Sequence, residues 1–271
     1  MDEEAVDSDR EWRTAHEDLT DEEWELIENF FPTYSRPGTL GRPAKWTKRD
    51  IVNGILYVLA TGCQWRALPK EYPHWNTIHR YHRQWSTDGT WAAVSSHVTG
   101  LARLAEGRDP EPSAGVIDSR SVQGASTVTG ETRGYDAAKK ISGRKVFAIV
   151  DTLGLLLAVA VVAASTSENA GGIEVVKRLS HRSSRLKLIW SDQGFKKAFA
   201  KACRAVKIVA KVVVRTKKKG FEPIPRRWVV ERTFSWIINQ RRLKIDYERK
   251  TSTTEGFIWA AQTKLALRRL T

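Results

Sequence analysis

Apolar side chains recur at helical spacing in the first part of the chain and form short runs in the rest. Thr20 and Thr47 predict the N-caps of two amphipathic helices, which end near Phe31 and Gly62. A third helix is expected from Asn76 or Thr77, and a fourth, flanked by loops, within residues 86–113. Because two of these helices are separated by a turn and the later one is basic, residues 19–105 are expected to form a helical, helix-turn-helix-like DNA-binding domain.

After Pro112 the period changes, and short apolar runs bounded by turn residues predict strands. The predicted strands cover residues 114–118, 144–151, 155–164, 186–192 and 208–216. Predicted helices cover residues 169–181 and 194–206, and a last one starts at residue 225. Three strands in a meander, followed by alternating helix and strand, describe an α/β fold with a mixed sheet and helices on both faces. We assign this fold to residues 106–271.

The helix expected from Pro225 carries one candidate for chemistry. Pro225 suits the first turn of a helix, where its missing N–H group would have had no partner. An apolar stripe follows at Val230, Phe234, Ile237 and Ile238, and Glu231 lies on the polar side. Taken alone, Glu231 is better explained by pairing with Arg227 or Arg232 on a solvated surface.

Two aspartates change that interpretation, since Asp118 and Asp192 each end a predicted strand. If the first strand is central and the fourth pairs with it in parallel, both aspartates reach the same edge of the sheet. Glu231, on a helix packed across that edge, supplies a third carboxylate. Three carboxylates repel one another unless cations neutralise them, and oxygen-only ligands favour Mg²⁺ or Mn²⁺. A pair of such ions serves phosphoryl transfer on DNA.

Composition supports a nucleic-acid partner. The formal net charge is +14, while residues 1–18 hold eight acids and two arginines, so the remaining residues carry about +20. We expect residues 1–18 to be a disordered acidic arm. Two cysteines without a paired spacing argue against a zinc cluster and a disulfide framework. The amino terminus lacks the pattern of a signal peptide and no apolar run is long enough to span a bilayer, so a cytoplasmic location is expected.

Three histidines, His74, His79 and His82, lie close together in the sequence. No cysteine or carboxylate is placed to complete a tetrahedral metal site with them. We therefore interpret them as packing or phosphate-contacting groups.

Several motifs in a fixed order resemble the DDE transposases of bacterial insertion sequences, most closely the IS5 family of the IS4/IS5 superfamily. They are LTDEEW (19–24), GRP (41–43), GCQWRALP (62–69), VIDSRSV (116–122), YDAAKKISGRK (135–145), VDTLGLLLAV (150–159), SDQGF (191–195) and RRWVVERTFSW (226–236). The resemblance implies a ribonuclease H-like catalytic domain with Asp118, Asp192 and Glu231 as metal-binding catalytic triad. It also implies two Mg²⁺ or Mn²⁺ ions, binding of terminal inverted repeats, DNA cleavage, strand transfer, and a homodimer on DNA.

The chain departs from the family pattern near the glutamate. The tyrosine–arginine–glutamate–lysine signature keeps Arg227 and Glu231 but has Ile224 and Ile238 at the outer positions. The basic–histidine pair before the second strand and the acidic–arginine motif after the third are also altered, to residues 145–147 and 167–169. Two further functions therefore stay open: a DNA-binding regulator that no longer cuts, and a nuclease of the same fold that cuts without joining.

Basic residues around these motifs are expected to position DNA through its phosphates without reading its sequence. The predicted DNA contacts are Arg42, Lys45, His79, Arg80, Arg83, Arg120, Lys139, Lys140, Arg144, Lys145, Arg227, Arg232, Arg241 and Arg242.

Overall fold

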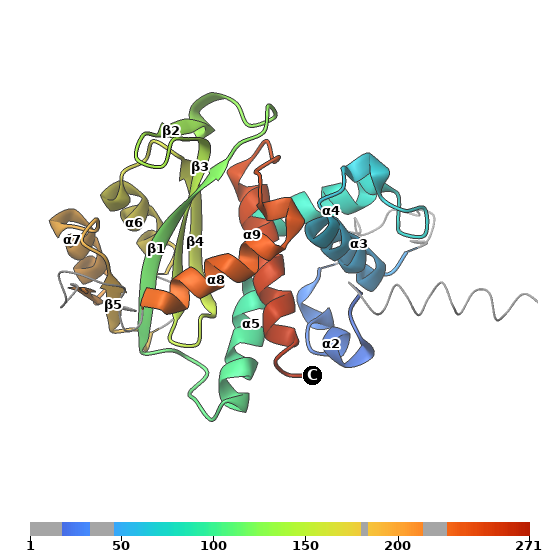
Figure 1. The fold of residues 1–271 in the computed structure, drawn as a ribbon. Helices are drawn as coiled ribbons and strands as arrows, with labels where there is room; N and C mark the ends of the chain where they lie inside the picture. Colours follow the sequence, from blue (N-terminus) through green and yellow to red (C-terminus); the bar gives the residue numbers. More distant parts are fainter. Residues whose placement is uncertain (1–17, 33–45, 180–183, 214–226) are drawn as a thin grey trace, which may run out of the picture.

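The structure is a computed structural model that describes residues 18–32, 46–179, 184–213 and 227–271 (Figure 1). Most of the predicted acidic arm, together with Arg42 and Lys45, lies outside these residues. In Figure 1 a sheet flanked by helices lies to one side, a group of helices lies to the other, and α9 runs between them.

Five helical segments form the amino-terminal part: α2 (Asp21–Glu25), η1 (Glu28–Phe30), α3 (Lys48–Thr61), η2 (Trp65–Ala67) and α4 (Trp75–Thr87). Thr20 and Thr47 cap α2 and α3 through complete capping boxes, as predicted. Gly62 ends α3 in the left-handed region, at φ 69°. Residues 62–74 join α3 to α4, so this helix pair lacks the short turn of a compact helix-turn-helix. The helix α5 (Thr90–Ala105) follows.

The sheet has six strands: β1 (Ala114–Gln123), β2 (Gly134–Asp136), β3 (Ile141–Asp151), β4 (Leu156–Ala163), β5 (Leu188–Ser191) and β6 (Val209–Val212). Its order is β2-β3-β1-β5-β6, with β4 also paired to β3. β1 pairs antiparallel with β3 and parallel with β5, and β5 pairs parallel with β6. The central first strand, its parallel partner and the ribonuclease H-like mixed sheet are confirmed.

Two features of the sheet differ from the prediction. β1 continues past Asp118 to Gln123 because its ladder with β3 extends that far, so Asp118 lies inside the strand. The short strand β2 was not predicted. In the expected order come α6 (Glu168–Lys177), α7 (Lys197–Ala205) and α8 (Arg227–Asn239), followed by η4 (Arg241–Leu243) and the unpredicted α9 (Thr251–Leu267).

Helices cover both faces of the sheet, and each face has its own core. Under α6 and α7 the core contains Ile117, Phe147, Phe195 and Phe199. The core on the opposite face contains residues of α8 and α9 and continues into α3, α4 and α5. The amino-terminal helices and the sheet therefore share one apolar core around α9.

Polar contacts strengthen this junction. The Nε2 atom of His82 on α4 lies 3.2 Å from the carbonyl oxygen of Thr253 on α9. Lys264 on α9 forms a buried ion pair with Glu23 on α2 at 2.8 Å. Gly256 on α9 packs so closely against Ser86 that a side chain there would clash. Among the described residues no helix is long and apolar enough to cross a membrane.

Candidate active site

Asp118 and Asp192 occupy matching positions on neighbouring parallel strands. The β1–β5 ladder sets Val116 opposite Trp190, an offset of 74 residues. Continued by two residues, the same offset brings Asp118 opposite Asp192, which directly follows β5. Because adjacent strands lie about 4.8 Å apart, this offset would bring the backbones of the two aspartates close together where β5 ends.

Asp118 is on the face of the sheet that α8 covers, and Asp192 directly follows the neighbouring strand. Side chains alternate between the faces of a strand, so Asp118 shares the face of Val116. Val116 and Trp190 belong to the core that includes α8. Arg120, two residues beyond Asp118, lines a small hollow together with Phe234 and Ile237 of α8.

Backbone amides orient the two carboxylates. The Ser119 N–H group donates to Oδ1 of Asp118 at 2.8 Å, and the Gly194 N–H group donates to Oδ1 of Asp192 at 2.8 Å. Both aspartates are half-buried. A hydrogen bond from the main chain restricts the rotation of a carboxylate, so the positions of these oxygens follow from the backbone.

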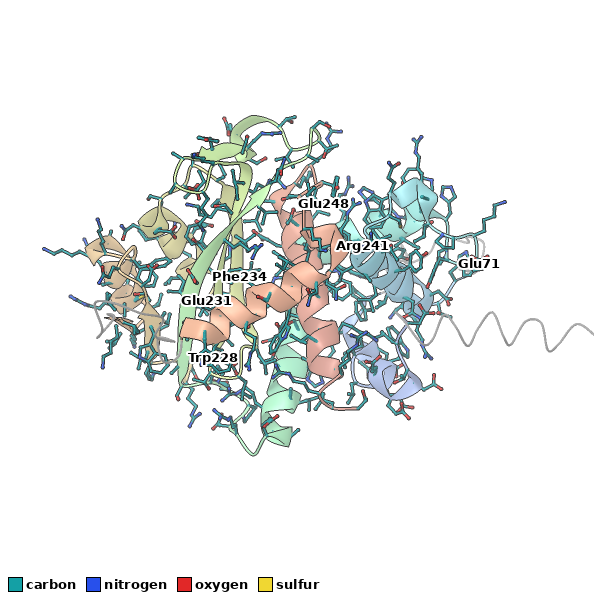
Figure 2. The ribbon with its side chains drawn as sticks, viewed as in Figure 1. Glu71, Trp228, Glu231, Phe234, Arg241 and Glu248 are labelled. Carbon is teal, nitrogen blue, oxygen red and sulfur yellow. The ribbon has the colours of Figure 1, made fainter. Side chains whose placement is uncertain are left out.

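Glu231 is exposed on the part of α8 that lies over β1 (Figure 2). The helix is fastened to the turn between β3 and β4, because Thr233 Oγ1 donates to the Gly154 carbonyl at 2.8 Å and Arg232 donates to the Leu153 carbonyl at 3.0 Å. Its residues Val230 and Phe234 are buried. Packing and these hydrogen bonds thus hold the helix on the face that carries the aspartates.

The three predicted carboxylates do not form a metal-binding group in the structure. Among the described residues no three His, Cys, Asp or Glu side chains are arranged so that they could hold a metal ion. Asp118 lies in β1, Asp192 directly follows the neighbouring strand β5, and Glu231 lies on α8 over β1.

A fourth acid, Glu168 at the start of α6, was not predicted as a site residue. It accepts a hydrogen bond from Ser119 Oγ at 3.0 Å and pairs with Lys145 at 3.5 Å. Its Cγ atom lies near Gly194, where an added Cβ would be 3.1 Å away. Glu168 therefore contacts the residue after Asp118 and the turn after Asp192, from the opposite face of the sheet. The sequence signal was its position in the altered acidic–arginine motif.

Two family models together match most of the chain. Residues 109–262 match the transposase DDE domain, and residues 19–95 match a transposase family of the IS4/5 type. The chain belongs to the IS4/5-family DDE transposases. It is also similar to the uncharacterized 16.2 kDa protein of insertion element IS402 from Burkholderia cepacia, with 33% identity over 120 residues. That match covers 42% of this transposase and 80% of the relative.

DDE transposase domains generally use divalent metal ions, and the donor atoms here suit such ions. The candidate ligands Asp118, Asp192 and Glu231 offer only carboxylate oxygens, which Mg²⁺ and Mn²⁺ prefer. The first two already lie on adjacent strands. Glu231 would have to approach them for all three to bind one metal centre.

Several predicted DNA contacts of the transposase lie at its surface. Arg80 and Arg83 are exposed on α4, Lys139 and Lys140 on the turn before β3, and Arg241 at η4. His79 and Arg120 are half-buried. Burial, with the charges of Arg83 and Arg242, lowers the pKa of His79. Arg232 is partly buried between the rings of Trp228 and Trp236, at 4.3 and 4.5 Å. The side chain of Arg227 lies outside the described parts.

Three other predicted contacts do not fit their surroundings, and the prediction is corrected for them. Arg144 is fully buried and forms an ion pair with Asp246 at 2.9 Å. Lys145 is buried between Asp136 and Glu168, each at 3.5 Å. Arg242 is buried and forms an ion pair with Glu248 at 2.6 Å. Their charges are already paired inside the protein, and removing either partner would leave an uncompensated buried charge.

The surroundings of the ion pair between Lys145 and Asp136 also change the pKa of Asp136. The hydroxyl of Ser121, more than the Lys139 amide and the Lys145 ammonium, lowers the pKa of Asp136 to about 2. Asp136 is therefore ionised at neutral pH, and Lys145 has a permanent partner.

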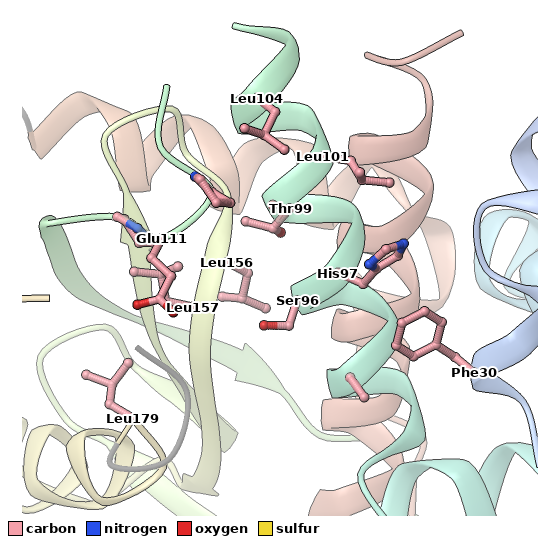
Figure 3. Close-up of a pocket in the computed structure, with 14 residues that line it drawn as sticks. Phe30, Ser96, His97, Thr99, Leu101, Leu104, Glu111, Leu156, Leu157 and Leu179 are labelled. Atoms are coloured by element: carbon pink, nitrogen blue, oxygen red, sulfur yellow. The ribbon is translucent and has the colours of Figure 1, made fainter. Parts of the chain in front are cut away.

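A separate hollow of about 580 Å³ between α5 and the start of β4 is lined mainly by apolar side chains and contains none of the predicted site residues (Figure 3).

Proposed function

We propose that this transposase binds the terminal inverted repeats of its own element and catalyses metal-dependent DNA cleavage and strand transfer. The observation that supports the proposal is the β1–β5 register, whose offset, continued past Val116 and Trp190, would bring Asp118 opposite Asp192, while Glu231 lies on α8 over β1. Membership of the DDE transposase family supports cleavage and joining of DNA in general.

In this proposal Asp118, Asp192 and Glu231 hold two Mg²⁺ or Mn²⁺ ions. When bound, such ions activate the attacking oxygen and stabilise the leaving oxygen of a phosphodiester. The chain's own contribution is orientation: the amides of Ser119 and Gly194 fix the two aspartates, and the contacts of α8 with the β3–β4 turn hold Glu231 above them.

DNA is the partner on grounds of charge and of family. The exposed arginines of α4 and the exposed lysines before β3 would contact phosphates of the repeat and of the target. Two DNA ends have to be processed together, so the working form is a homodimer on DNA, in the bacterial cytoplasm with the nucleoid.

The test is cleavage of an end-labelled duplex that carries the terminal repeat of the encoding element, with Mg²⁺ or Mn²⁺. Wild type should give metal-dependent 3′-hydroxyl ends, whereas Asp118→Asn, Asp192→Asn and Glu231→Gln should bind the duplex without cutting it. The matched control is Glu106→Gln, which changes an exposed carboxylate at the end of α5. Full cleavage by any triad variant would remove that residue from the site.

A second candidate function is a DNA-binding regulator that no longer cuts. It is favoured by one observation, the altered family motifs at residues 145–147 and 167–169. This alternative predicts salt-sensitive binding of the repeat and no metal-dependent product from wild type. A pre-cut end offered with target DNA separates both functions from a nuclease, which would cut without joining.

A further inference from the structure

A groove of about 930 Å³ lies where the amino-terminal helices meet the sheet. One side is formed by α4 and the segment around Trp65, and the other by residues 127–129 and 247–253. Figure 2 labels Glu248 and Arg241 at this meeting point, opposite α3 and α4. We name this hollow the junction groove. It contains none of the three predicted carboxylates of the active site.

The junction groove carries uncompensated positive charge. Arg83, Arg249 and Lys250 line it and are exposed. Within the described residues their side chains take part in no ion pair or hydrogen bond. Glu248 is the one carboxylate among the described lining residues, and it is buried and bound by Arg242 at 2.6 and 2.9 Å. An anionic ligand would therefore meet three available cations and no competing acid.

An exposed aromatic ring lies among these cations. Tyr247 is 40% exposed, and the guanidinium of Arg242 lies 5.2 Å from the centre of its ring. The hydroxyl-bearing residues Thr127 and Thr129 line the same wall and are exposed. Cations that follow a phosphate backbone, together with an aromatic ring on which a base can stack, are typical of sites for unpaired nucleic acid.

The wall that carries these residues is rigid before any ligand arrives. Arg144 of β3 donates to the carbonyl oxygens of Glu248 at 2.8 Å and Arg249 at 3.1 Å, and Thr127 Oγ1 donates to the carbonyl of Tyr247 at 2.7 Å. A site that is already ordered loses little conformational entropy when it binds its ligand.

We propose that the junction groove binds an unpaired strand of DNA, with phosphates on Arg83, Arg249 and Lys250 and a base stacked on Tyr247. This inference rests on the proposed function, because it names the form of DNA that passes between the helices and the sheet. A strand that separates from a duplex held at α4 would follow this path onto the sheet domain, which carries the active site.

The experiment measures binding by fluorescence anisotropy in EDTA, so that cleavage plays no part. The probes are a labelled oligothymidylate of about 12 nucleotides and a blunt duplex of about 20 base pairs. Tyr247→Ala should weaken binding of the oligothymidylate about tenfold and leave the duplex within about twofold. For the oligothymidylate, the slope of log K against log[salt] should become less steep by about 0.7 in each of the variants Arg83→Ala, Arg249→Ala and Lys250→Ala. The matched control is Tyr135→Ala, since Tyr135 is 56% exposed on β2, outside the groove.

The proposal is overturned if Tyr247→Ala leaves oligothymidylate binding unchanged, or weakens the duplex as much as the single strand. Its failure is distinguishable from failure of the proposed function. If Tyr247→Ala binds the oligothymidylate as wild type does, and wild type cleaves the terminal repeat, only the proposed groove function is refuted. If Tyr247→Ala binds the oligothymidylate more weakly, and wild type does not cleave, only the proposed transposase activity is refuted.

Discussion

Arg144 provides the sharpest test of the distinction between a buried structural arginine and a DNA contact. Its guanidinium is fully buried and donates to Asp246 and Thr254, to Thr132, and to two backbone carbonyls of the 248–249 segment. The change Arg144→Met keeps an unbranched side chain of similar length and removes every one of these donors. It leaves the carboxylate of Asp246 buried without its cation.

The magnitude follows from that unpaired charge. Breaking a buried ion pair by removing one partner costs about 3–5 kcal/mol, more than the loss of neutral hydrogen bonds alone. Asp246→Asn in the same chain removes the buried charge and should recover about 1–3 kcal/mol, since an amide costs less to bury than an unpaired carboxylate. The two changes lie in direct contact, so their effects should not add.

The assay is urea unfolding followed by tryptophan fluorescence, with wild type, both single variants and the double variant. Lys140→Met, which changes an exposed lysine before β3, is the control and should unfold at the wild-type midpoint. Binding of the duplex is measured for each variant below its unfolding transition. If Arg144→Met unfolds at the wild-type midpoint but binds DNA more weakly, Arg144 acts on DNA and the structural argument is wrong. If the single variant does not fold, Asp246→Asn alone still tests the pair, because it should be destabilised.

Two further changes test other contacts. Burial above all lowers the pKa of His82 to about 3 from an ordinary value of 6.5, although the Thr253 carbonyl opposes this shift. Folded His82 stays neutral while the unfolded chain takes up a proton, so its contribution to the free energy of unfolding is constant above pH 6.5 and falls by up to about 1.4 kcal/mol per pH unit below it. In urea unfolding at several pH values, His82→Gln should therefore reduce the dependence of the unfolding free energy on pH. An unchanged pH dependence would contradict a neutral, buried His82. Glu168→Gln weakens the contacts to Ser119 and Lys145. If Glu168 only positions the aspartates, DNA cleavage should fall about tenfold while duplex binding stays unchanged. Equal losses in binding and cleavage would indicate a general structural role instead.

All strands of the described residues except β2, and most helices, could be predicted from the sequence because their apolar residues follow one period. The chain from β3 to α8 is of this kind, and the parallel pairing of β1 with β5 follows from the crossover rule. The helix α9 could not be found in this way. It contacts α4, α5 and β4, so even its polar residues Thr253, Gln262 and Lys264 are buried. A helix buried on several sides has no single apolar stripe in its sequence that would predict it.

Of the candidate site, the sequence predicts the positions of the aspartates but not which basic residues are buried. The two aspartates follow from strand ends and pairing, although Asp118 lies inside a longer strand than expected. Basic residues are a different case, because an arginine looks the same in the sequence whether it is paired or exposed. Arg144 finds Asp246 across 102 residues, while Arg83 faces the junction groove. Only the folded chain separates the two.

The carboxylates of the site depend on different parts of the fold. Asp118 and Asp192 take their positions from backbone pairing and from amide hydrogen bonds, which do not depend on side-chain packing. Glu231 takes its position from a helix that buried side chains and two hydrogen bonds to the β3–β4 turn hold in place. A small shift of that helix would change the distance from Glu231 to the aspartates and leave the aspartate pair unaltered. In the proposed triad, Glu231 is therefore the member whose distance to the other two changes with the position of α8.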